Sequence, residues 1–145
     1  MKAALALADD GKARWTVELT PEAQRWYSGL RGEEKSRVTA ALDELQSKGP
    51  ATGRPFVDSI KRSRHHNMKE LRGGTNLRAL FVFDPGRRAV VLVGGDKAGN
   101  WKGWYKQNIP RADRLYDRHL QDLGKEAAWR PGQRRAGRPS GGRSP

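Results

Sequence analysis

The sequence predicts an α+β protein with an N-terminal strand and a helical hairpin packed on a small, mainly antiparallel, four-stranded sheet, followed by a C-terminal helix. Two observations predict this class. Apolar residues recur with helical spacing in two segments before residue 50, and strongly apolar segments separated by a turn follow between residues 77 and 93. With 145 residues and 35% hydrophobic content, the chain can form one domain with one modest core.

The first half of the chain predicts one strand and two helices. Residues 15–19 alternate apolar and polar side chains, which is the pattern of a half-buried strand. A helix should start at Thr20-Pro21-Glu22, because Thr is a good N-cap, Pro suits the first helical position and an acid suits the positive helix end. Its apolar face would be Ala23, Trp26, Tyr27 and Leu30. A second helix is expected from about Glu33 to Lys48, and the short connection at Gly32 predicts an antiparallel hairpin. Its apolar stripe would be Val38, Ala41, Leu42 and Leu45.

The second half predicts most of the sheet. Residues 67–72 form a plausible strand with poor alternation, since Met68 and Leu71 would point to opposite faces. Residues 77–83, LRALFVF, precede a turn at residues 84–87, and the chain returns as a strand at residues 89–93, which predicts a central hairpin. We expect residues 98–108 to form a loop before the last helix. The face of that helix would be Ala112, Leu115, Tyr116, His119, Leu120 and Leu123, with the histidine packed or hydrogen-bonded rather than a ligand.

Three segments are expected: a flexible N-terminus at residues 1–13, one domain at residues 14–123, and a disordered basic tail rich in Arg, Gly and Pro at residues 124–145. The apolar run at the N-terminus is too short for a signal peptide and ends in Asp9 and Asp10. No run is long enough to span a membrane, and the lack of cysteine fits a reducing compartment. These features predict a cytoplasmic protein.

Positive charge indicates a polyanionic partner. The net charge is +13, of which the tail from Gly124 onward contributes +5 and the rest of the chain +8. Such an excess attracts phosphate backbones in a salt-dependent way. Cations concentrate between Ser59 and Arg88, and six of them, from Lys61 to Arg78, flank a single acid, Glu70, and two histidines, His65 and His66. The cations are Lys61, Arg62, Arg64, Lys69, Arg72 and Arg78. This segment therefore predicts binding of nucleic acid.

An aromatic segment follows the predicted sheet. Trp101, Trp104 and Tyr105 alternate with Lys102 and Lys106. They can provide a stacking surface for bases beside phosphate contacts, each stack contributing on the order of 1 to 3 kcal/mol. The alternative is that these side chains cover an edge of the core. Three scattered histidines and no cysteine argue against a zinc site, and we expect neither a metal nor a cofactor.

The run KELRGGTNLRALFVFDPGRRAVVLVGGDKAGN, residues 69–100, resembles the sheet of the RelE/ParE superfamily of toxins, and is most similar to its HigB-like, phage-derived branch. The features that carry the resemblance are an ELR strand, an LR pair that opens the next strand, a turn, and an apolar strand that ends in glycine and lysine. In element order the resemblance covers about residues 15–123, whereas residue-level motifs are confined to Met68–Lys97.

The resemblance implies a metal-independent endoribonuclease that cleaves mRNA, in many relatives in the ribosomal A site. Such chemistry is attack of a ribose 2′-hydroxyl on the adjacent phosphate, which needs a base, an acid and cations. The implied partners are mRNA, in some relatives the ribosome, and a cognate antitoxin, commonly of helix-turn-helix type. Two alternatives remain: a non-catalytic ParE-like toxin that poisons gyrase, or a basic accessory protein that binds nucleic acid.

The resemblance also suggests site residues. Arg78 matches the family's phosphate-stabilising arginine, Lys97 matches a basic residue at the end of the following strand, and Tyr105 stands near a tyrosine that stacks on a base. Some ribosome-dependent relatives carry two lysines where this chain has Met68 and Glu70, so their acid/base scheme does not transfer. The nearest substitutes for proton transfer are His65, His66 and Lys69. The candidates for RNA binding are Lys61, Arg62, Arg64, Arg72, Trp101, Lys102 and Trp104.

Several of these residues also have a purely structural interpretation. Arg72 and Glu70 share a strand face and can form a structural ion pair, while the two histidines and Lys97 can be solvated loop residues. Arg78 favours a functional role more strongly, because a cation in an apolar strand needs a partner or a cleft.

Overall fold

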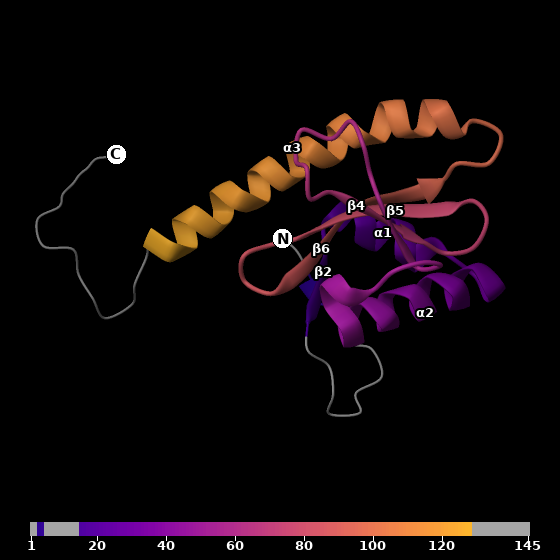
Figure 1. Ribbon diagram of the computed structural model, residues 1–145, viewed down its shortest axis with the longest axis horizontal. Helices are drawn as coiled ribbons and strands as arrows, with labels where there is room; N and C mark the ends of the chain where they lie inside the picture. Colours follow the sequence, from indigo (N-terminus) through magenta and orange to yellow (C-terminus); the bar gives the residue numbers. More distant parts are fainter. Residues whose placement is uncertain (1–2, 5–14, 129–145) are drawn as a thin grey trace, which may run out of the picture.

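The computed structural model describes residues 3–4 and 15–128 of the chain. Two strands precede a helical hairpin, four strands follow it, and a long helix ends the described part (Figure 1). The elements are β1 (Ala3–Ala4), β2 (Thr16–Leu19), α1 (Pro21–Gly29), α2 (Gly32–Lys48), the short 3-10 helix η1 (Gly49–Ala51), β3 (Val57–Ser59), β4 (Lys69–Arg72), β5 (Leu77–Phe83), β6 (Arg88–Asp96) and α3 (Trp101–Ala128).

The strands form one sheet in the order β1-β2-β6-β5-β4-β3, in which only the β2–β6 pairing is parallel among the described strands. The predicted α+β class and the central β5–β6 hairpin are confirmed. The sheet has six strands rather than the four expected, because β1 and β3 contain two and three residues. Segments this short carry no periodic pattern.

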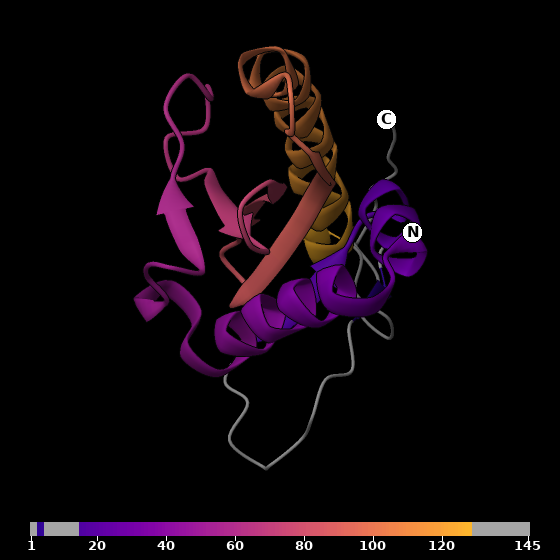
Figure 2. The same ribbon diagram turned by 90° about the vertical axis from the view of Figure 1, so that its right-hand side faces the viewer.

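The helical hairpin covers one face of the sheet, while α3 crosses the other (Figure 2). Thr20 caps α1 as predicted, since its hydroxyl accepts a hydrogen bond from the backbone N–H of Ala23 at 3.1 Å. All four residues of the predicted α2 stripe are buried. They pack with side chains of β2, β5 and β6 into the first hydrophobic cluster, which includes Val17, Leu19, Val38, Leu42, Leu45, Phe81 and Val91.

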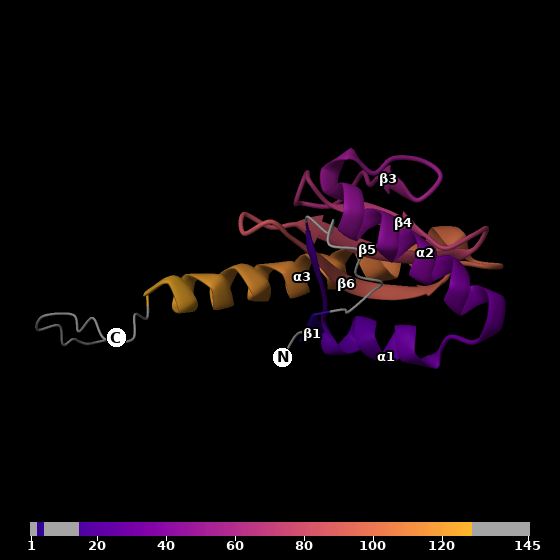
Figure 3. The ribbon, with the colours of Figure 1, turned by 90° about the horizontal axis from the view of Figure 1, so that it is seen from below.

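The second cluster packs the sheet against α3, which runs behind the sheet in the view from below (Figure 3). It joins Leu80, Val82, Val90 and Leu92 of the sheet, with Met68 just before β4, to Ile109, Ala112 and Tyr116 of α3. The expected loop at residues 98–108 is wrong in most of its length, because α3 begins at Trp101. Gly103 and Pro110 lower the helix propensity of this segment, but packing of Tyr105 and Ile109 against the second cluster outweighs that preference.

Two adjacent glycines on β6 allow a tryptophan to approach from each face of the sheet. A Cβ at Gly94 would lie 2.2 Å from Cε3 of Trp26 in α1, and one at Gly95 would lie 2.5 Å from Nε1 of Trp104 in α3. Neither distance is sterically possible without displacing the indole. The glycine pair therefore sets how closely both layers of helix pack on the central strand.

The far end of α3 is held by a buried polar network. His119 is 2% exposed, and its Nε2 lies 2.8 Å from Oδ2 of Asp84, while Nε of Arg88 lies 2.9 Å from the same oxygen. The expectation that His119 is a hydrogen-bonded, packed residue is confirmed. Leu120, predicted on the same apolar face, is exposed.

The predicted termini of the domain are only partly described. The two-residue strand β1 lies inside the segment expected to be flexible, and α3 continues past residue 123 to Ala128. Residues 1–2, 5–14 and 129–145, which include the rest of the expected N-terminus and tail, lie outside the described residues. Within the described ranges, no helix is both long enough and apolar enough to cross a membrane.

Candidate nucleic-acid interface

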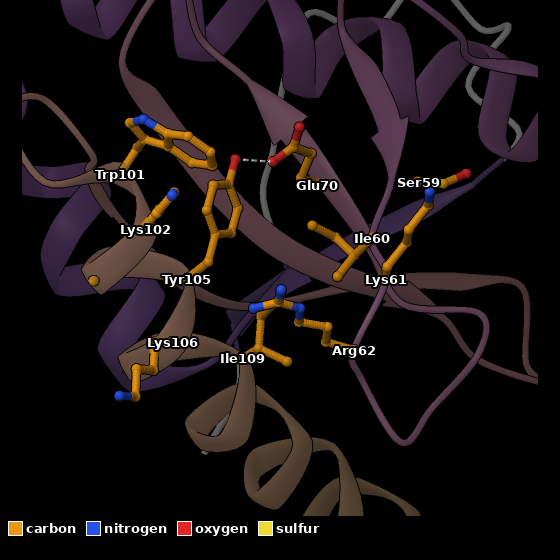
Figure 4. A pocket seen from close by; sticks show the side chains of 11 residues that line it. Ser59, Ile60, Lys61, Arg62, Glu70, Trp101, Lys102, Tyr105, Lys106 and Ile109 are labelled. Carbon is orange, nitrogen blue, oxygen red and sulfur yellow. Dashed lines mark hydrogen bonds between the residues drawn. The ribbon is translucent and has the colours of Figure 1, made fainter.

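A pocket of about 530 Å³ opens between the sheet edge and the first turns of α3 (Figure 4). One wall is the end of β3 with the segment after it, the opposite wall is α3, and Glu70 of β4 lies between them. The lining residues are Ser59, Ile60, Lys61, Arg62, Glu70, Trp101, Lys102, Gly103, Tyr105, Lys106 and Ile109. The α3 side chains come together because Trp101, Lys102, Tyr105, Lys106 and Ile109 recur three or four residues apart on one helix face.

The pocket is strongly cationic. Lys61 and Arg62 extend from one wall, Lys102 and Lys106 from the other, and all four side chains are exposed. Glu70 is the single acid among the lining residues. Opposed cations across a small concave surface favour an anionic ligand, because their potentials add where the low-dielectric walls limit screening.

Glu70 and Tyr105 form a hydrogen-bonded pair at the inner surface of the pocket. The Tyr105 hydroxyl donates to Oε1 of Glu70 at 2.5 Å, and Glu70 is only 4% exposed. Burial raises the pKa of Tyr105 to about 12, and the hydrogen bond to Glu70 and its negative charge act in the same direction, opposed by Arg78. Tyr105 is therefore a proton donor at neutral pH.

Two arginines neutralise Glu70, and one of them, Arg78, faces the carboxylate oxygen that Tyr105 also binds. Nε of Arg72 donates to Oε2 of Glu70 at 3.1 Å, which confirms the expected ion pair on this strand face. Arg78 pairs with Arg72 across β4 and β5, and its Nε lies 3.8 Å from Oε1 of Glu70. The Arg78 guanidinium also donates through Nη1 to the carbonyls of Gly74 and Leu77, both at 2.9 Å.

These contacts place Arg78 behind the pocket. It is 5% exposed and does not line the cavity, so its guanidinium contacts two backbone carbonyls and Glu70 rather than a ligand. Arg72 is about one-third exposed and is further bound to Asp58, with 3.8 Å between Nη2 and Oδ2. The backbone N–H of Ser59 is the main cause of the lowered pKa of Asp58, and Arg54 and Arg72 add to it.

Other predicted site residues are directed elsewhere. Arg64 and His65 both bind Asp117 of α3, beyond the pocket. His66 is exposed, Lys97 is partly buried, and neither lines the cavity. Lys69 is out of phase with Glu70 on β4, so its side chain leaves from the opposite face of the sheet.

The sequence allowed two roles for the aromatic residues, base stacking and packing at an edge of the core, and the structure places one tryptophan in each setting. Trp101 is 55% exposed at the pocket, with its ring 6.5 Å from that of Tyr105 and Nζ of Lys102 at 5.7 Å from its centroid. Trp104 instead packs on the second cluster and on Gly95. Trp101 is thus available for stacking, while Trp104 is a packing residue.

Three features of the site were not predicted from sequence. Glu70 was considered only as an ion-pair partner, yet it is the one acid of the pocket. Ile60 and Ile109, which supply apolar surface, carry no sequence signal for a site.

In the described ranges, no group of three His, Cys, Asp or Glu side chains is arranged to hold a metal ion.

A helical hairpin and a long C-terminal helix on opposite faces of one sheet, with a cationic pocket under that helix, define a small basic α+β protein. The chain belongs to the family described as Phage derived protein Gp49-like (DUF891), whose model matches residues 25–117. The expected place in the HigB-like, phage-derived branch of the RelE/ParE superfamily of toxins is confirmed by this match and by the relatives that follow.

Two similar proteins come from Mycobacterium tuberculosis, and both are named as toxins. HigB3 is 54% identical over 105 residues, which cover 72% of this chain and 92% of HigB3. HigB2 is 44% identical over 110 residues, which cover 73% of this chain and 54% of HigB2. Among solved structures, a chain of the toxin–antitoxin complex RelBE2 from the same species is 22% identical, with a TM-score of 0.39, and the match covers 57% of this chain and 96% of that one. That structural similarity is too low to support any comparison of sites.

Proposed function

We propose that the protein is the toxin of a type II toxin–antitoxin module and cleaves mRNA as a metal-independent endoribonuclease. The observation that carries this proposal is the pocket itself, in which four cations and an exposed tryptophan surround a Tyr105–Glu70 pair. RNA cleavage by its own 2′-hydroxyl needs these groups: cations for the phosphate, an aromatic surface for a base, and acid and base groups for two proton transfers. Membership of a family with relatives named as toxins gives the biological setting.

In the proposed reaction, Glu70 accepts the proton of the ribose 2′-hydroxyl as its oxygen attacks the adjacent phosphorus. Tyr105 donates its proton to the departing 5′-oxygen, so the products are a 2′,3′-cyclic phosphate and a 5′-hydroxyl. The hydrogen bond between the two side chains then returns the proton from Glu70 to Tyr105 and restores the starting state. A phenol whose pKa is about 12 stays protonated until the leaving oxygen develops charge.

The remaining lining residues bind the RNA in this proposal. Lys61 and Arg62 bind the phosphate backbone from one wall and Lys102 and Lys106 bind it from the other, while Trp101 stacks on a neighbouring base. Arg78 acts through Glu70 as a positioning residue, because its guanidinium is bound to that carboxylate and to two backbone carbonyls. Catalytic roles for His65, His66, Lys69 and Lys97 stay predictions without a contact in the pocket.

We also propose that a cognate antitoxin, of helix-turn-helix type, covers this pocket. A segment with acidic and apolar side chains would complement the four cations and the exposed Trp101. A comparison of the cleavage of free mRNA with the cleavage of mRNA under translation tests whether the reaction requires the ribosome. Co-expression of the gene next to the toxin gene should restore growth if it encodes the antitoxin.

The experiment is induced expression in a bacterial host, with growth followed and the 5′ ends of mRNA mapped. The pocket variant Lys102→Gln/Lys106→Gln is matched by Lys35→Gln/Lys48→Gln, which removes the same charge from α2, on the other face of the sheet. Growth arrest accompanied by new mRNA cuts supports the proposed RNase activity if both effects are lost in the pocket variant and kept in the control variant. On whichever substrate is cut, free or translated mRNA, the purified protein should need no added metal, and it should leave an RNA with a 2′-deoxy scissile position intact.

Two results would overturn the proposal. Arrest without mRNA cuts would favour a non-catalytic ParE-like toxin acting on gyrase. Absence of arrest, together with RNA binding by the purified protein, would favour a basic nucleic-acid-binding accessory protein.

A further inference from the structure

The loop that carries Lys61 and Arg62 is fastened to α3 by side chains outside the pocket. The hydroxyl of Ser63 donates to Oδ1 of Asp113 at 2.5 Å, and the backbone N–H of Arg64 donates to Oδ2 of the same carboxylate at 3.3 Å. Asp113 is only 4% exposed. Ser63 also accepts a hydrogen bond from the backbone N–H of His65 at 3.0 Å, so one hydroxyl joins the loop to itself and to the helix.

A second acid, one helical turn further along α3, holds the same loop. Asp117 binds the guanidinium of Arg64 through Oδ2 and Nε2 of His65 through Oδ1, the latter at 2.8 Å. The His65 ring also meets the ring of Tyr116 edge-on, with 4.8 Å between their centroids. Asp113 and Asp117 therefore form an acidic clamp on residues 63–65.

The backbone of the loop shows why such a clamp is needed. Arg62 has φ of +74°, in the left-handed region that a residue with a side chain avoids. This conformation costs roughly 1 to 3 kcal/mol and persists only where surrounding contacts impose it. Arg62 is a pocket residue, and the clamp begins at the next residue along the chain.

We propose that Asp113 and Asp117 are positioning residues that set the separation of the two pocket walls. They join the loop wall directly to the helix wall, which carries Lys102 and Lys106 about two to four turns earlier on α3. Without the clamp, Lys61 and Arg62 move away from the cations on α3, and the two walls no longer face the same stretch of RNA backbone. The consequence for RNA binding rests on the proposed function, whereas the consequence for pocket geometry does not.

The proposal predicts a change in RNA affinity opposite to the change that net charge alone predicts. Asp117→Asn raises the net charge by one, which by itself strengthens attraction to RNA. The clamp instead predicts weaker binding, since the amide loses the ion pair with Arg64. Asp43→Asn is the matched control, because Asp43 is an exposed acid of α2 and the change in charge is the same.

Ser63 offers a test without any change in charge. Ser63→Ala removes the hydroxyl that joins Asp113 to the loop, and Ser63→Thr keeps it. Because the chain has no cysteine, spin labels can be placed at Lys61→Cys and Gln107→Cys to report the distance across the pocket. We expect a narrow distance distribution for the unchanged serine and for Ser63→Thr, which both carry the hydroxyl, and a broader, longer distribution for Ser63→Ala.

RNA affinity is measured separately, without labels, on a single-stranded 2′-O-methyl RNA that cannot be cleaved by its own 2′-hydroxyl. Ser63→Ala and Asp117→Asn should each weaken binding about 5-fold or more, comparable to loss of one hydrogen bond, while Ser63→Thr and Asp43→Asn do not. An unchanged label distance in both clamp variants would overturn the proposal, as would a widened pocket that binds RNA with full affinity. A wild-type protein that binds no RNA would instead overturn the proposed function, and the label distances would still decide whether the clamp sets the pocket width.

Discussion

Tyr105 of α3 and Glu70 of β4 are 35 residues apart in sequence, and their side chains meet at 2.5 Å in the pocket. The carboxylate is further bound by Arg72 and faces Arg78, so the tyrosine hydroxyl is the one neutral donor in an otherwise charged network. This pair connects the sheet to the helix and provides both proton-transfer groups of the proposed reaction.

Tyr105→Phe should abolish most cleavage while RNA binding is retained. The ring stays in place, but the proton donor is lost, which costs roughly 10²- to 10⁴-fold in rate. Leaving the buried Glu70 without this donor also lowers the free energy of unfolding by about 1 to 3 kcal/mol. Cleavage of a labelled RNA, fluorescence anisotropy and urea denaturation measure the three quantities. Tyr27→Phe is the control, since its hydroxyl bonds Thr39 on the opposite face of the sheet; an equal loss of cleavage there would contradict the assignment.

Stability should fall at alkaline pH because of Tyr105. Its pKa rises from the ordinary 10.0 to about 12 on folding. The folded state therefore keeps a proton that the unfolded chain releases, so the contribution is complete below pH 10.0 and is lost as the pH rises toward about 12. Tyr116 also has a raised pKa and acts in the same direction. Urea denaturation across this range should show a steeper decline for wild type than for Tyr105→Phe, and parallel declines would refute the prediction.

Arg62→Gly should change stability and RNA affinity in opposite directions. Glycine accepts the left-handed backbone at residue 62 without steric cost, so the free energy of unfolding should rise by about 1 kcal/mol. The same change removes one cation from the pocket and weakens RNA binding. Arg87→Gly is matched, because Arg87 also has a positive φ, of 61°, but does not line the pocket. If both variants lose RNA affinity equally, Arg62 contributes only to net charge.

Asp84→Asn should destabilise the fold by roughly 3 to 5 kcal/mol, because Arg88 and His119 lose the buried anion that they share. Burial alone raises the pKa of Asp84, but the hydrogen bond from His119, the N–H groups of Arg88 and Gly86 and the charge of Arg88 lower it overall. The resulting stability is present above the ordinary carboxyl value of 3.8 and is lost as the pH falls through the lower folded value. Acid denaturation should therefore be shallower in the variant, and RNA binding at neutral pH should not weaken.

The elements predicted well are those with local signals. The β5 bounds, residues 77–83, agree with the prediction, and the stripes of α1 and α2 lie on the sheet as expected. Each depends on periodicity, capping or turn residues within a short window, which act before any tertiary contact forms. The start of α3 was missed because packing on the second cluster outweighs the weak helix propensity around Gly103 and Pro110.

The candidate site was predicted in part. Its cationic and aromatic members, including Lys61, Arg62, Lys102 and Tyr105, follow from composition and from the family resemblance. The same reasoning placed Arg64 and His65 with them, although both are turned toward Asp117. Neighbouring residues of a loop can point in different directions, and sequence does not determine which ones face a distant helix.

Local patterning and residue content were enough for the α+β class, the order of the main elements, the family and the cationic character of the site, because none of these depends on long-range contacts. Which residues share the pocket depended on the packing of the whole chain. Placement of α3 across the sheet brings Tyr105 to Glu70, leaves Arg78 behind that carboxylate and fastens Ser63 to Asp113. These contacts lie on the face of the sheet that α3 covers, and they form only once the chain is packed, because each joins side chains from different strands, loops or helices.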